Sequence, residues 1–174
     1  MRSIAIEAVY DTSREVLPHE IFWEALQTAF AKNGRLLVTD AKRADGLVRA
    51  HITAGYIQPA GTPERETGDK DPKITRSEKP RPEEFRNLTR SGSWTTTESL
   101  GFTVTIELWD LRTRKMISQK HYTGAGSYKS VLAETGSSGV QKSMQYLIYE
   151  ESLQTQFKKI SQQIADKAVS DVFL

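Results

Sequence analysis

The sequence of 174 residues contains no cysteine. This absence excludes a disulfide framework, a thiol nucleophile and any zinc or iron–sulfur site built on thiolates. No apolar run approaches the roughly 20 residues that a membrane-spanning helix needs. The 24 Lys and Arg are nearly balanced by 22 Asp and Glu, so the net charge of +2 gives little general attraction to nucleic acid. A chain of this length is long enough to be stabilised by a hydrophobic core alone.

Motifs that would indicate catalysis are also missing. The histidines His19, His51 and His121 are scattered and do not have the spacing of metal ligands. The segments 124–129 and 136–143 begin like phosphate-binding loops, but each lacks a glycine that the motif requires. No serine lies in a nucleophile elbow. We therefore expect that the protein is not an enzyme and that it binds no metal or cofactor.

Two amphipathic helices are predicted, one early and one at the end of the chain. The first spans residues 18–33, where Pro18 fits the first turn and Asn33-Gly34 supplies the left-handed stop. Its apolar stripe consists of Ile21, Phe22, Ala25, Leu26, Ala29 and Phe30. The stripe of the last helix consists of Leu153, Phe157, Ile160, Ile164, Ala168 and Val172.

Strands are predicted where apolar and polar residues alternate. The clearest is a hairpin over residues 102–123, and shorter strands are expected near residues 4–10, 36–38 and 48–56. After the hairpin, residues 127–145 are small and polar, and Gly136-Ser137-Ser138-Gly139 within them is expected to be flexible. The fold class that follows is α+β, with two amphipathic helices packed on one face of a four- to five-stranded mixed sheet. We expect a single domain over residues 1–174.

Residues 59–98 have a different composition from the rest of the chain. They contain five of the six prolines and a dense mixture of charges, which predicts a long loop inserted between strands instead of a core element. Its cations are candidate contacts for an anionic partner such as a phosphorylated glycolipid. They are Lys73, Arg76, Lys79, Arg81, Arg86 and Arg90. The alternative is a solvated loop that contacts no ligand.

Several of these segments resemble the lipopolysaccharide-assembly lipoproteins of the LptE type. The strand break, Asp11-Thr12-Ser13, and the helix core Glu24-Ala25-Leu26-Gln27-Thr28-Ala29-Phe30 are similar to the family's opening. Gly34-Arg35-Leu36-Leu37-Val38 and Ala44-Asp45-Gly46-Leu47-Val48 follow in the family's order, and Leu108-Trp109-Asp110-Leu111-Arg112-Thr113 resembles its hairpin. The chain departs from the family in having Arg114 where glycine is usual, and in the insert over 59–98.

The resemblance implies a non-enzymatic subunit that assists lipopolysaccharide assembly and transport to the cell surface. Its implied partners are an outer-membrane β-barrel protein and lipopolysaccharide or another anionic glycolipid, on the periplasmic side of the outer membrane. It also implies a lipid anchor on a cysteine upstream of Met1. A periplasmic lipoprotein subunit of an exopolysaccharide or curli-type secretion channel is the alternative, because the opening strand and helix also resemble such proteins. We do not expect nucleic acid as a partner.

Overall fold

The structure is a computed structural model that describes residues 1–15, 17–60, 64–67, 92–132 and 139–172. Side chains are described over 1–15, 17–60, 97–129 and 147–172. Within these ranges, no helix combines the length and the apolar character needed to cross a membrane.

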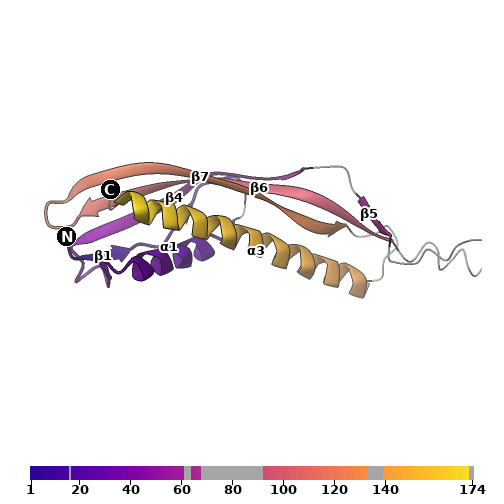
Figure 1. Ribbon diagram of the computed structural model, residues 1–174, viewed down its shortest axis with the longest axis horizontal. Helices are drawn as coiled ribbons and strands as arrows, with labels where there is room; N and C mark the ends of the chain where they lie inside the picture. Colours follow the sequence, from indigo (N-terminus) through magenta and orange to yellow (C-terminus); the bar gives the residue numbers. More distant parts are fainter. Residues whose placement is uncertain (16, 61–63, 68–91, 133–138, 173–174) are drawn as a thin grey trace, which may run out of the picture.

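The strands in the described part of the chain form one sheet (Figure 1). They are β1 (Ser3–Ile6), β2 (Tyr10–Asp11), β3 (Leu37–Val38), β4 (Gly46–Pro59), β5 (Glu64–Thr67), β6 (Gly92–Asp110) and β7 (Lys115–Leu132). β1 is parallel to β3 and β4, and β2 is parallel to β4, whereas β4, β5 and β7 are antiparallel to β6. Because β7 pairs along nearly all of β6, β4 and β5 share the other edge of β6. The predicted mixed sheet is confirmed.

The two helices, α1 (His19–Asn33) and α3 (Gly139–Val172), lie on the same face of this sheet (Figure 1). Both predicted apolar stripes point into one continuous core with the helix-facing side chains of β4, β6 and β7. Phe102 of β6 is at the junction of the layers. Its ring meets Phe22 of α1 edge-on at 6.0 Å and stacks on Phe157 of α3 at 4.5 Å. The predicted α+β architecture, with both helices on one face, is therefore confirmed.

The end of α1 agrees with the sequence signal. Gly34 has φ of 69°, and its backbone N–H donates to the carbonyl oxygen of Phe30 at 3.3 Å. A residue with a Cβ atom is strained in this left-handed conformation, so glycine ends the helix at low cost. The chain then returns to the sheet as β3.

The last helix packs closely against β7. A Cβ atom added at Gly124 would overlap the side chain of Ile160, so glycine allows the helix to approach the strand. Near the end of the helix, the hydroxyl of Tyr122 donates to Asp171 Oδ2 at 3.2 Å. Burial, together with the charge of Asp171, raises the pKa of Tyr122 to about 12. The phenol therefore stays neutral across the physiological range.

The sheet is larger than the four or five strands predicted from sequence, and its long strands reach further. β3 is the strand expected near residues 36–38, whereas β2 has only two residues and is separate from β1, which divides the strand expected near residues 4–10. β5 and the first residues of β6 lie inside the predicted insert 59–98, because a strand ladder needs only backbone hydrogen bonds and tolerates polar side chains. Likewise β7 extends to Leu132 and α3 begins at Gly139, so residues 127–132 and 139–145 of the small, polar segment are regular structure. The flexible piece expected at 136–139 lies outside the described residues, apart from Gly139.

The junction of the layers gives a test of the fold. Phe157 is completely buried and stacks on Phe102. We expect Phe157→Ala to lower the free energy of unfolding by about 3–5 kcal/mol, because it removes a large buried side chain and leaves a cavity. Urea denaturation followed by circular dichroism measures this change. Lys158→Ala, at the neighbouring exposed position, is the control and should change the value by less than about 0.5 kcal/mol. Equal effects for the two variants would contradict this packing.

Candidate functional site

In the described part of the chain, helices cover only one face of the sheet (Figure 1). We call the other face the open face. It is formed by the side chains of alternate residues on three neighbouring strands: Arg49 and His51 on β4, Thr103, Thr105, Glu107 and Trp109 on β6, and Gln119, His121 and Thr123 on β7. Most of these side chains are polar, and they lie opposite one another in register across the strands.

A first row of open-face side chains is built around Glu107. Trp109 Nε1 donates to Glu107 Oε2 at 2.8 Å, and Gln119 Nε2 donates to its other carboxylate oxygen at 3.3 Å. Arg49, directly opposite on β4, donates from Nε to Glu7 Oε2 at 2.6 Å. Its guanidinium carbon also lies 5.5 Å from the centre of the Trp109 ring, within range of a cation–π contact. The charges of this row offset one another.

A second row crosses the sheet two residues further along and contains two of the three histidines. The rings of Tyr10 and His51 stack with their centroids 5.8 Å apart. His51 lies opposite Thr105, and Thr105 Oγ1 lies 2.8 Å from His121 Nδ1. Thr105 is only 6% exposed because these neighbours pack around it. The hydrogen bond fixes the orientation of a histidine whose outer side is exposed.

Local turn chemistry places Tyr10 beside His51. The predicted break at residues 11–13 is an Asx-type turn, in which the backbone N–H of Ser13 donates to Asp11 Oδ1 at 2.8 Å. Thr12 Oγ1 donates to the carbonyl oxygen of Ile52 at 3.0 Å and fastens the turn to β4. The sequence signal for the break was correct, but it did not show that the turn holds an aromatic ring on the sheet.

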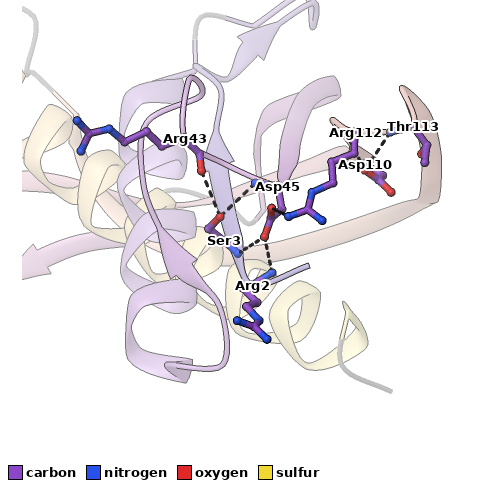
Figure 2. A network of polar contacts seen from close by, with 7 residues as sticks. All are labelled: Arg2, Ser3, Arg43, Asp45, Asp110, Arg112 and Thr113. Atoms are coloured by element: carbon purple, nitrogen blue, oxygen red, sulfur yellow. Dashed lines mark hydrogen bonds and ion pairs between the residues drawn. The ribbon is translucent and has the colours of Figure 1, made fainter.

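A separate polar network lies at the end of the sheet where the chain begins (Figure 2). Asp45 accepts hydrogen bonds from the backbone N–H groups of Arg2, at 2.8 Å, and Ser3, at 3.3 Å. Its other oxygen accepts from Arg112 Nη2 at 2.7 Å. Asp110 accepts from the backbone N–H groups of Arg112 and Thr113 in the β6–β7 turn. The network therefore joins the first strand to the hairpin, and its role is structural.

The hydrogen bonds of this network stabilise the ionised carboxylates. The backbone N–H of Arg2 and then the side chain of Arg112 lower the pKa of Asp45 from 3.8 to about 2. The backbone N–H groups of Arg112 and Thr113 lower the pKa of Asp110. Both groups remain charged at the pH of any ordinary assay.

The cations predicted as anionic-partner contacts lie outside the described residues. Lys73, Arg76, Lys79, Arg81, Arg86 and Arg90 all fall within 68–91, so the structure gives no position for them. Among the residues that are described, no group of three or more His, Asp or Glu side chains could hold a metal ion.

The rows of the open face were not predicted, although part of their signal is in the sequence. The alternation of Thr103, Thr105, Glu107 and Trp109 with apolar residues shows that one face of β6 is polar. The sequence does not reveal the register of β4 and β7 against β6, which brings distant side chains such as His51 and His121 to either side of Thr105.

No protein-family model matches the chain, and no curated protein matches its sequence. Solved structures with a similar arrangement include a hypothetical protein, CT253, from Chlamydia trachomatis, with 14% identity and a TM-score of 0.48 over 99% of this chain and 96% of that one. A PelC dodecamer from Paraburkholderia phytofirmans has 10% identity and a TM-score of 0.46, over 97% and 87%. A minor lipoprotein from Acinetobacter baumannii has 14% identity and a TM-score of 0.36, over 96% and 94%. At these values we draw no conclusion about family or function.

The Asp45 network predicts a pH dependence of stability. Because the pKa of Asp45 is lower in the folded chain, its contribution is complete above about pH 4 and is lost as the pH falls towards 2. We expect Asp45→Asn to be less stable than the wild type at pH 7 and to differ from it less and less between pH 4 and 2. Urea denaturation across this range measures the difference. Asp40→Asn, an exposed aspartate, is the control for loss of charge, and a constant difference for Asp45→Asn would contradict the assignment.

Proposed function

We propose that the chain is a non-enzymatic lipoprotein subunit of the outer membrane, which assists the assembly of lipopolysaccharide at the cell surface together with a β-barrel partner. The observation that supports a binding role is the open face. It extends over β4, β6 and β7, the charged groups around Glu107 offset one another, and side chains such as Glu107 and Thr105 are already held by their neighbours. A surface organised in this way can bind without rearrangement, which lowers the entropic cost of association.

The shape of the molecule is compatible with a barrel partner. The 34 residues of α3 form a rod about 51 Å long at 1.5 Å per residue. The interior of an outer-membrane barrel is polar, and its apolar outer band is about 25 Å tall. The outer side of α3 bears Lys158, Lys159, Gln163 and Asp166, which suit a polar wall. In this arrangement α3 faces the barrel and the open face is left for the cargo.

The finer parts of the proposal rest on the sequence resemblance. The LptE-like segments support lipopolysaccharide as the cargo and a lipid anchor upstream of Met1. The open face supports a binding role in general, and it would serve equally in the alternative, a subunit of a polymer-secretion channel. The two functions differ in stoichiometry, because a barrel plug is present in one copy and a channel subunit forms a ring.

A matched pair of variants tests whether the open face binds the cargo. Ala125 is exposed on the open face, and Ala31 is exposed on the outer side of α1. We expect Ala125→Glu to weaken binding of purified lipopolysaccharide about tenfold, which corresponds to roughly 1.4 kcal/mol, because a longer, negatively charged side chain obstructs the surface and repels an anionic ligand. Ala31→Glu should leave the affinity unchanged. Binding is measured by calorimetry on the purified full chain.

The partner and location are tested with the gene expressed under its own upstream sequence. We expect a lipidated product that fractionates with the outer membrane and co-purifies in one copy with a β-barrel protein. A ring of identical subunits without a barrel would favour the secretion-channel alternative. An unlipidated cytoplasmic product that does not bind lipopolysaccharide would refute the proposal.

A further inference from the structure

The open face presents two exposed aromatic rings. Tyr10 is 54% exposed beside His51, and Tyr56 is 40% exposed on β4. Tyr56 belongs to the same face as Thr103, because it lies opposite Gly101, two residues away on β6. Tyrosines are enriched at binding surfaces, because the ring offers an apolar face and the hydroxyl a polar contact.

Tyr56 lies across the neighbouring strand. A Cβ atom added at Gly101 would come within 2.5 Å of Cε1 and Cζ of the Tyr56 ring. The ring therefore occupies the space that a side chain at position 101 would fill, and it rests on the backbone of β6. In this position it covers the strand with one side and offers the other side to solvent.

The residues around this ring are small. The register places Ala125 beyond Gly101 on β7, Ser99 and Ser127 on one side, and Thr103 and Thr123 on the other. Thr103 Oγ1 and Thr123 Oγ1 lie 3.0 Å apart in a hydrogen bond. The Tyr56 ring is thus an aromatic platform with hydroxyl groups on both sides, and the residues across the strands from it, Gly101 and Ala125, are small.

A glycolipid has acyl chains, phosphate groups and sugars, and the side chains of the open face suit only one of these as a ligand. Acyl chains need a continuous apolar surface, whereas Tyr56 and Tyr10 are separated by threonine and histidine. Phosphate groups need clustered, unopposed cations, whereas Arg49 is paired with Glu7 and the exposed Lys129 lies ten positions away from it along β6. A sugar ring has C–H groups that pack on the negative face of an aromatic ring, and it has hydroxyls that bond to threonine, serine and histidine.

We propose that the open face binds an extended saccharide chain, with Tyr56 and Tyr10 as the stacking positions. This inference rests on the proposed function, since it names the saccharide portion of the glycolipid as what the surface holds. The two tyrosines lie on neighbouring strands, Tyr10 at the level of Thr105 and Tyr56 at the level of Gly101. The open-face residues at the level between them are Ala54 on β4 and Thr103 on β6. A linear chain laid across both rings would pass over Ala54 and beside the Thr103 hydroxyl.

The test uses calorimetry on the full chain with three probes: smooth lipopolysaccharide, the polysaccharide released from it by mild acid, and lipid A. We expect binding of the first two and at least about tenfold weaker binding of lipid A. Tyr56→Ala should weaken binding of the released polysaccharide about tenfold, whereas Tyr56→Phe, which keeps the ring, should stay within about twofold.

Two further variants distinguish the effect of displacing the Tyr56 ring from a nonspecific effect of mutation on binding. Gly101→Ala introduces a Cβ atom that displaces the Tyr56 ring, so it should weaken binding as Tyr56→Ala does, with Tyr56 still present. Ile148→Ala removes a side chain of similar exposure from α3 and should have no effect on binding. Urea denaturation of each variant checks that the fold is retained.

The outcomes distinguish this inference from the proposed function. Equal binding of lipid A and smooth lipopolysaccharide, unaffected by Tyr56→Ala, would overturn the saccharide site and leave the proposed function standing. If the purified chain binds the released polysaccharide but the native protein co-purifies with no β-barrel protein, the saccharide site stands and the proposed function is overturned. The third outcome combines two results. A barrel segment competes with the polysaccharide for the wild-type chain, and Tyr56→Ala binds the polysaccharide as tightly as the wild type does. The face would then be a protein interface, and the saccharide inference would be wrong.

Discussion

The packing of both helices against the same face of the sheet determines most of this structure. Phe102 contacts Phe22 and Phe157 together, so the two helices share one core and neither can move to the other face without exposing it. At about 25 cal/mol for each Å² of apolar surface removed from water, the burial of these rings stabilises the contact between the helices and the sheet. The consequence for function is that β4, β6 and β7 keep a complete face free of helices in the described part of the chain.

A face without a helix can remain stable in water only if its polar groups are hydrogen-bonded or hydrated and its long strands do not slip in register. Here both conditions are met by the same side chains. Glu107 accepts hydrogen bonds from Trp109 and Gln119, and Thr105 bonds to His121, so cross-strand pairs hold β6 and β7 in register. The side chains that stabilise the face also determine what it can bind, since their positions are already fixed.

The helices and the hairpin were predictable because their signals are local. Gly34 ends α1 where the sequence places it, and the stripe of α3 from Leu153 to Val172 is the one observed. The short apolar run at 36–38 indicated β3, but β2 was not predictable as a separate strand, since it depends on pairing with residues about 40 positions away. The candidate site depends on such pairings as well. The sequence showed that one side of β6 is polar, but it did not show that Tyr10, His51 and His121 belong to the same surface.

Two glycines illustrate what a single sequence conceals. As weak strand formers, Gly101 and Gly124 give no indication of a specific role. In the structure they lie on opposite faces: Gly124 lets Ile160 of α3 approach β7, and Gly101 lets the Tyr56 ring lie on β6. One glycine therefore belongs to the core and the other to the binding surface, although both are glycines in extended strands. Register distinguishes them, because it determines which side chain fills the space that each glycine leaves.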